Sequence, residues 1–190
     1  MSNEITVKVI ASKEELIKHL EQKGFLYTRT FSLDDYYFIP KTLDIEKLTT
    51  REIISKSLII RNILDNNKYK KFITYKVKEI DEKGNILNQH AVNVEIFNIE
   101  QAKKLLEAIG YYQIMNIKED DVVYAKDGLE LAIKDVKNGD LLIEIETESN
   151  TKFDTIEKLK QIVKDLSLPI EPSEFFIKKA EIELEKTLKR

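Results

Sequence analysis

The stretch from Leu141 to Glu148, Leu-Leu-Ile-Glu-Ile-Glu-Thr-Glu, alternates carboxylates with apolar or neutral side chains. Successive side chains of an extended strand point to opposite faces, so Glu144, Glu146 and Glu148 share one face and the isoleucines share the other. Carboxylates about 7 Å apart along one face repel each other. A fold that keeps them together offers solvent, a metal ion or basic side chains opposite. The stretch therefore predicts a strand with one apolar face and one charged face.

Length and composition set the outer bounds. The chain has 190 residues, 42% of them hydrophobic, which is enough for one compact domain over residues 1–190. A net charge of -3 argues against a nucleic-acid partner that is bound through bulk positive charge. With no cysteine, no signal-peptide pattern and no long apolar run, we expect a cytoplasmic protein with no membrane partner, either monomer or homodimer.

Other segments alternate in the same way. Strands are predicted at 4–10, at 57–64 and 69–80 joined by an Asp-Asn-Asn turn, and at 86–97. A further hairpin is predicted at 129–136 and 141–148 about an Asn-Gly pair. Charged or polar side chains share one face of each strand: Glu4, Thr6, Lys8, Thr74, Lys76, Lys78, Asn93 and Glu95. The pattern indicates a shared polar interior.

The chain also repeats itself at a spacing of about 86 residues. Ser12 caps a predicted helix that Gly24 ends, and Asn98 and Gly110 do the same later in the chain. Aromatic and β-rich segments follow both glycines. This spacing predicts a domain built from two similar halves.

Counting these elements gives an α+β fold with about eight antiparallel strands. Further helices are expected at 44–56, 154–166 and 173–189. Helices on the apolar side leave the charged side either facing solvent on an open sheet or lining the lumen of a closed barrel. Periodicity alone favours the open sheet, because one-sided antiparallel sheets are common.

Several motifs resemble the CYTH superfamily of triphosphate tunnel proteins, which includes class IV adenylyl cyclases and thiamine triphosphatases. Glu4-Ile-Thr-Val-Lys8 is similar to the ExExK signature, Ser57 to Arg61 to the LRxR strand, and Thr74-Tyr-Lys76 to the TYK strand. Val94-Glu95 resembles the acidic strand that follows, and Glu144-Ile-Glu146 the closing ExE. The resemblance implies a closed eight-stranded antiparallel barrel with a polar lumen and helices outside.

The resemblance also implies roles for individual residues. It implies that Glu4, Glu144 and Glu146 bind Mg²⁺ or Mn²⁺, that Lys8, Arg61, Lys76 and Lys78 bind phosphate, and that Glu95 and Lys76 act in catalysis. All of these would point into one common cavity. The implied ligand is a small molecule carrying a triphosphate: inorganic triphosphate, a nucleotide or thiamine triphosphate.

The chain departs from the motifs at several positions. Thr6 stands in place of the second glutamate of ExExK, Ile59 in place of the first arginine of LRxR, and Glu119-Asp120-Asp121 where the family has basic residues. Two functions therefore remain open: a metal-dependent enzyme that hydrolyses the triphosphate or cyclises ATP, and a non-catalytic binder of nucleotide or polyphosphate.

Simpler interpretations of the same residues also remain. Glu144 and Glu146 are compatible with a solvated strand face, and Lys76 and Lys78 with edge-strand lysines that block aggregation. The two histidines, His19 and His90, lack the spacing of a zinc site.

Overall fold

The structure is a computed structural model, and it describes residues 2–80, 86–148, 156–171 and 179–188. Only the backbone is described for residues 2–4, 78–80, 86–89, 146–148 and 156. Among the described helices, none has the length and apolar character needed to span a membrane.

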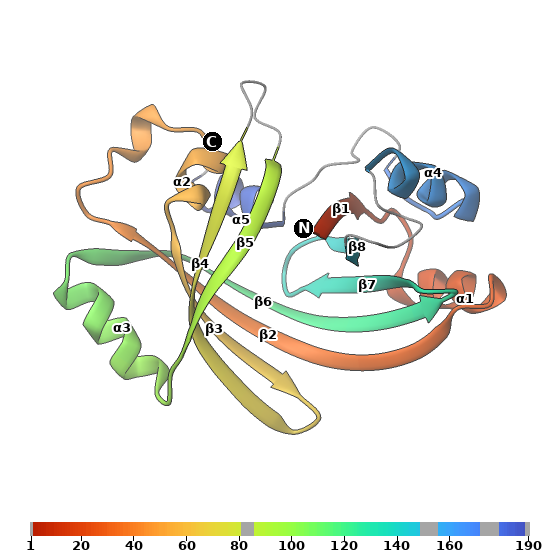
Figure 1. Cartoon of the computed structure of the whole chain (residues 1–190), viewed down its shortest axis with the longest axis horizontal. Helices are drawn as coiled ribbons and strands as arrows, with labels where there is room; N and C mark the ends of the chain where they lie inside the picture. The colour runs from red at the N-terminus through yellow and green to blue at the C-terminus, as the bar shows by residue number, and fades with distance from the viewer. Residues whose placement is uncertain (1, 81–85, 149–155, 172–178, 189–190) are drawn as a thin grey trace. The chain divides into compact units, whose positions relative to one another are not determined.

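The described residues form eight strands, with helices following β1, β2, β5 and β8 along the chain (Figure 1). The strands are β1 (Ser2–Lys8), β2 (Leu26–Pro40), β3 (Leu58–Asp65), β4 (Lys68–Ile80), β5 (Ile86–Glu95), β6 (Tyr111–Lys126), β7 (Leu129–Val136) and β8 (Leu141–Glu148). The helices are α1 (Lys13–Gln22), α2 (Thr50–Ser55), α3 (Ile99–Ala108), α4 (Ile156–Leu166) and α5 (Lys179–Leu188), with a 3-10 turn at Ile45–Lys47.

The strands form one sheet in the hydrogen-bonded order β1-β8-β7-β6-β2-β3-β4-β5. Strands β1 and β5 stand at the two ends of this order and are not neighbours, so the described sheet is open. The prediction of a closed barrel with a lumen is therefore wrong. Closure requires the two end strands to pair at a suitable tilt and stagger, and a period-two pattern carries no information about either.

The chain divides into two compact units, and β2 and β6 pass through both. Unit 1 contains residues 1–31 and 119–179, and unit 2 contains residues 32–118 and 180–190. The single domain expected over residues 1–190 stays a prediction. Unit 1 carries 14 basic and 19 acidic residues, whereas unit 2 carries 17 and 15. The acidic excess of the protein therefore belongs to unit 1.

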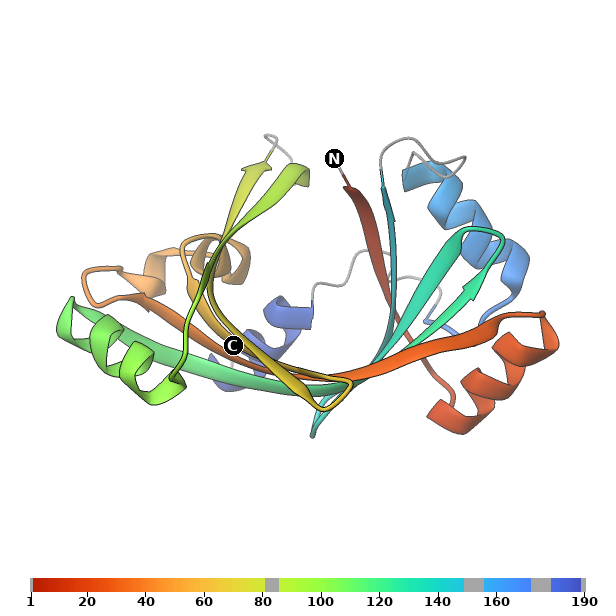
Figure 2. The ribbon, with the colours of Figure 1, turned by 60° about the horizontal axis from the view of Figure 1, so that its bottom comes forward.

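In unit 1, helices α1 and α4 pack on one face of the sheet formed by β1, β8 and β7 (Figure 2). The buried side chains on that face include Ile5 and Val7 from β1 and Ile143 and Ile145 from β8, all 0% exposed. Removing large aliphatic side chains such as these from water stabilises the fold by about 1.5–3 kcal/mol each. The apolar face predicted for the stretch 141–148 is confirmed.

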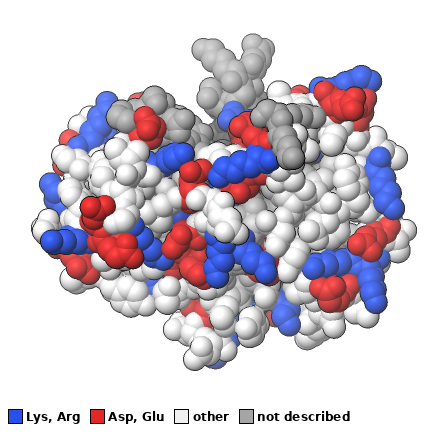
Figure 3. Space-filling view, turned by 180° about the vertical axis from the view of Figure 1, so that it is seen from behind, with Lys and Arg blue, Asp and Glu red and all other residues white. Residues whose placement is uncertain are grey.

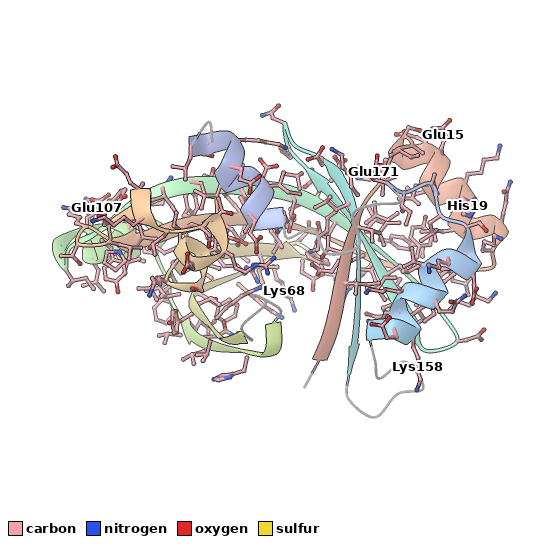
Figure 4. The ribbon with its side chains drawn as sticks, turned by 90° about the horizontal axis from the view of Figure 1, so that it is seen from above. Glu15, His19, Lys68, Glu107, Lys158 and Glu171 are labelled. Atoms are coloured by element: carbon pink, nitrogen blue, oxygen red, sulfur yellow. The ribbon has the colours of Figure 1, made fainter. Side chains whose placement is uncertain are left out.

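His19 fixes the position of α1 against the end of α4. Its ring nitrogen Nε2 lies 2.9 Å from the carbonyl oxygen of Leu166. Glu15 and His19 both extend from α1 in Figure 4. His19 therefore has a structural partner.

In unit 2, helix α3 packs on the sheet formed by β2 and β3. Ala102 and Leu106 of α3 join Phe38 and Ile60 in one buried cluster. The Nζ atom of Lys103 lies 3.6 Å from the centroid of the Tyr36 ring, which adds a cation–π contact to this packing.

The two halves follow the predicted spacing of 86 residues. Helices α1 and α3 begin at Lys13 and Ile99, after the caps Ser12 and Asn98. Gly24 and Gly110 both have positive φ, 83° and 93°; Gly110 directly precedes β6, and one residue separates Gly24 from β2. Left-handed backbone of this kind is tolerated best by glycine, which explains both positions.

The helix expected at 44–56 is shorter than predicted. Thr49 is extended and caps α2 through a capping box with Glu52, so the helix begins only at Thr50. The residues before it form the 3-10 turn. The last predicted helix begins at Lys179 in the described chain, and 173–178 lie outside the described residues.

Candidate functional site

The face of the unit 1 sheet opposite α1 and α4 carries the charged side chains. Cross-strand pairing places Thr6 opposite Glu144, and Glu144 opposite Ala132 on β7. Residues 4 and 146 are also directly opposite each other in the backbone register. The three residues predicted to bind metal therefore belong to neighbouring rows of β1 and β8 in the backbone register.

A buried group of charges lies on this face, on β6, β7 and β8. The Nζ atom of Lys134 lies 3.0 Å from Asp121 Oδ2, 3.2 Å from Glu144 Oε1 and 3.6 Å from Glu119 Oε1. Lys134 has a side-chain exposure of 7%, and Glu119 and Asp121 have 0%. Three carboxylates thus share one ammonium, and Lys179 adds a second contact to Glu119 at 2.5 Å. We call Glu119, Asp121, Lys134 and Glu144 the Lys134 cluster.

Two carboxylate oxygens of the Lys134 cluster have no hydrogen-bond partner although they are buried. They are Oε2 of Glu119 and Oδ1 of Asp121. Burial is the main cause that raises the pKa of Asp121 to about 6. The negative charge of Glu119 raises this pKa further, and the positive charge of Lys134 lowers it. The cluster therefore holds more negative charge than its lysines neutralise.

Burial alone would lower the pKa of the Lys134 ammonium. The carboxylates of Glu144, Glu119 and Asp121 outweigh that effect, and the pKa of Lys134 is raised above its ordinary value. Lys134 is therefore a permanent cation at neutral pH.

A cavity of about 120 Å³ opens beside the Lys134 cluster. Its charged lining consists of Arg29, Glu130, Lys134 and Glu144, and three apolar or small side chains complete it. The guanidinium carbon of Arg29 lies 5.8 Å from the centroid of the Phe31 ring. The cavity has room for several water molecules and is polar enough to hold them.

Lys8, the first predicted phosphate binder, lies near the end of β1. Its Nζ atom lies 2.8 Å from Asp140 Oδ1, and its side chain is 38% exposed. A ligand phosphate would therefore share Lys8 with a carboxylate.

In unit 2, the corresponding face lies opposite the α3 cluster. Cross-strand pairing places Arg61, Phe72 and Glu95 in one row of β3, β4 and β5. Lys76 lies on the same face, opposite Ala91. Arg61, Lys76 and Glu95 therefore share a face, as the alternation predicts, and the side chain of Lys78 lies outside the described residues.

Arg61 forms a bidentate ion pair with Asp35 of β2. Its Nε atom donates to Asp35 Oδ1 at 2.8 Å and its Nη2 atom to Oδ2 at 2.6 Å. The Asp35 side chain is 1% exposed, so Arg61 compensates a carboxylate charge that solvent hardly reaches.

The two predicted catalytic residues are not adjacent. Glu95 stands opposite Phe72, whereas Lys76 is four residues further along β4, or about 13 Å at the rise of a strand. Glu95 is exposed and Lys76 is half-buried.

The predicted site residues divide between the two units. Glu4, Lys8, Glu144 and Glu146 belong to unit 1, and Arg61, Lys76, Lys78 and Glu95 belong to unit 2. Their convergence on one cavity stays a prediction.

Sequence reasoning missed Lys134 and Arg29. Lys134 continues the alternation of β7 and falls directly opposite Asp121 of β6. The sequence did contain a sign of this contact: Lys134 lies in the hairpin that follows the acidic run 119–121. Only the register of β6 and β7 shows that Lys134 and Asp121 are direct neighbours.

The face shown in Figure 3 carries acidic and basic side chains interspersed, without an extended patch of one sign.

Comparisons with known proteins show what this chain is similar to in sequence and in fold. A provisionally named adenylate cyclase of Methanocaldococcus jannaschii is 26% identical over 169 residues, which cover 87% of this chain and 90% of that protein. A structure from Pyrococcus horikoshii has a TM-score of 0.73 at 23% identity, with both chains covered in full. The chain has the fold of this structure. No protein-family model matches it.

A plant protein also has this fold. It is a provisionally named adenylyl cyclase from Hippeastrum, described as having a dominant triphosphatase activity. Its TM-score is 0.59 at 18% identity, with 90% of each chain covered.

Proposed function

We propose that this protein binds a small molecule that carries a triphosphate and hydrolyses it. The observation that carries the proposal is the fold shared over 90% of the chain with a protein described as a triphosphatase. The sequence similarity to a provisionally named adenylate cyclase points to the same class of ligand. Inorganic triphosphate, a nucleotide and thiamine triphosphate are the candidate ligands.

Cations on the charged faces would hold the phosphate groups. Lys8 and Lys76 each offer an ammonium, and Arg61 offers a planar guanidinium. Charge-assisted hydrogen bonds to phosphate are short and each contributes about 1.5–3 kcal/mol. Glu95 and Lys76 are proposed to position the attacking water and the leaving phosphate.

Two of the three predicted metal ligands, Glu4 and Glu146, have side chains outside the described residues, so the predicted metal site stays a prediction. In the described part of the chain, no group of three or more His, Asp or Glu side chains is arranged to hold a metal ion. Glu144, one of the three predicted ligands, already contacts Lys134. Glu4, Glu144 and Glu146 would hold Mg²⁺ or Mn²⁺, which would supply positive charge to neutralise the phosphate.

The alternative function is binding without catalysis. It is favoured by the ion pairs of the candidate cations, because Lys8 and Arg61 each contact a carboxylate in the structure. A carboxylate partner weakens the electrostatic attraction between each cation and a phosphate group, while the ion pair itself still stabilises the fold.

Phosphate release separates the two functions. Tripolyphosphate, ATP and thiamine triphosphate are each incubated with the protein, with Mg²⁺, with Mn²⁺ and with chelator, while the melting temperature is recorded in parallel. Release of phosphate supports the enzyme; a raised melting temperature without release supports the binder. If no compound changes the melting temperature at millimolar concentration and none is hydrolysed, both proposals fail.

A further inference from the structure

The cavity of unit 1 exists because of a small side chain on β7. Cross-strand pairing places Glu144 of β8, Ala132 of β7 and Val123 of β6 in one row, and all three line the cavity. Ala132 has the shortest side chain of this row, so space remains above its methyl group. A cavity of about 120 Å³ that holds several water molecules also has room for an anion of the size of a phosphate group.

Arg29 brings its guanidinium to this cavity from β2. Arg29 and Phe31 both line the cavity, and the guanidinium carbon lies 5.8 Å from the centroid of the Phe31 ring. Between them, the hydroxyl of Thr30 donates to the backbone carbonyl oxygen of Asp121 at 2.8 Å, which fixes β2 against β6. The cation–π contact and this hydrogen bond therefore orient the guanidinium beside the cavity.

The guanidinium of Arg29 makes no hydrogen bond within the part of the chain that the structure describes. The carboxylate oxygen with which it pairs, Oε2 of Glu130, lies 3.9 Å from its Nη2 atom, which is too far for a hydrogen bond. The side chains of Arg29 and Glu130 are 51% and 55% exposed, so solvent screens their attraction. By contrast, the ammonium of Lys134 is shared among three carboxylates.

A guanidinium with available donors suits a phosphate group. Its planar fork donates two parallel hydrogen bonds to two oxygens of one phosphate, whereas an ammonium acts as a point charge. The charged lining of the cavity consists of two cations and two carboxylates. An anion is therefore attracted most strongly to the cation that has no carboxylate within hydrogen-bond distance, and that cation is Arg29.

We propose that Arg29 binds a phosphate group of the ligand in this cavity, and that Glu130 competes with the phosphate for the guanidinium. The inference rests on the proposed triphosphate function and adds to it a binding residue on β2, where no phosphate binder was predicted. When the phosphate enters, Arg29 exchanges a distant carboxylate for a hydrogen-bonded one, and the half-exposed Glu130 side chain turns to solvent.

The test is calorimetric titration of tripolyphosphate and of pyrophosphate into the whole chain, for the unaltered protein and its variants. Arg29→Met should weaken the binding of both probes about tenfold or more, because charge-assisted hydrogen bonds are lost. Arg29→Lys keeps the charge without the fork and should recover only part of the affinity. Glu130→Gln removes the competing carboxylate and should strengthen binding about threefold, but it should change nothing in the Arg29→Met background.

The matched control is Lys137→Met. Lys137 also belongs to unit 1 and its side chain is 57% exposed, but it pairs with Asp120 and is not among the residues that line the cavity. This variant loses the same charge as Arg29→Met and should bind both probes as the unaltered protein does. An equal weakening in Lys137→Met and Arg29→Met would assign the effect to net charge and overturn the proposal.

The outcomes separate this inference from the function on which it rests. Binding that Arg29→Met and Arg29→Lys leave unchanged contradicts the inference, while the proposed function stands. A gain from Glu130→Gln that persists in the Arg29→Met background contradicts the competition. If neither probe binds to the unaltered protein or to Glu130→Gln, both proposals fail. Melting temperatures without ligand show that each variant is folded, and Arg29→Lys carries the test if Arg29→Met is not.

Discussion

The ion pair between Arg61 and Asp35 gives the sharpest test of how unit 2 is held together. Arg61→Met keeps the aliphatic stem and removes the guanidinium, which leaves the carboxylate of Asp35 buried without its bidentate partner. Breaking a buried ion pair in this way costs about 3–5 kcal/mol. The Asp35 side chain is 1% exposed, so solvent can compensate little of that cost.

A double-mutant cycle measures the interaction itself. Asp35→Asn with Arg61→Met leaves no buried charge at the pair, so the double variant should lose less stability than the sum of the single losses, by about 2 kcal/mol or more. Urea unfolding at pH 7, followed by far-ultraviolet circular dichroism, gives all four free energies of unfolding.

Arg29→Met is the matched control for this cycle. Arg29 lies 3.9 Å from Glu130, with both side chains about half exposed, so its loss should cost less than about 1 kcal/mol. If Arg61→Met is no more destabilising than Arg29→Met, or if the two single changes add, the pair does not stabilise unit 2 and the reasoning is refuted.

Two further predictions concern Asp121 and the paired glycines. Because the pKa of Asp121 rises from 3.8 to about 6 in the folded state, the folded protein binds more protons between these values, and its free energy of unfolding should fall by about 3 kcal/mol as pH rises through that window. In Asp121→Asn, the free energy of unfolding measured in urea should decrease less between pH 4.5 and pH 6.5 than in the unaltered protein. An equal decrease in both proteins would contradict the raised pKa of Asp121. Gly24→Ala and Gly110→Ala place a Cβ on left-handed backbone, and each should lower the free energy of unfolding by about 1–2 kcal/mol. A change below about 0.3 kcal/mol at both sites would argue against the positive φ values.

Local structure was predictable because its causes lie close together in the sequence. Ser12 and Glu15 form the expected capping box, with Glu15 Oε2 accepting from the backbone nitrogen of Ser12 at 2.9 Å. The isoleucines of 141–148 are buried on the predicted face. In each case, the alternation or the cap spans at most a few residues.

Closure of the sheet was not predictable from the same pattern. Alternation along a strand such as β5 shows which side chains share a face. It does not show which strand pairs with its free edge. The open sheet that periodicity favoured is the one the structure has, and the closed form came from the family resemblance.

The Lys134 cluster was missed for a related reason. Its members come from β6, β7 and β8, and their contact depends on a register that places Lys134 opposite Asp121. Read alone, the run Glu119-Asp120-Asp121 indicated only a change of charge relative to related proteins. Similarly, Arg61 was predicted to bind phosphate before its partner Asp35, 26 residues away, was known.

The most direct test of the proposed function is phosphate release from tripolyphosphate, measured for the unaltered protein and for Lys76→Gln. Lys76 shares its sheet face with Arg61 and Glu95 and is assigned a role in both binding and catalysis. The account predicts release by the unaltered protein and at least a tenfold lower rate in Lys76→Gln, with Lys158→Gln on the exposed surface of α4 unchanged. Equal rates in the three proteins, or no release with any metal and no shift in melting temperature, would contradict it.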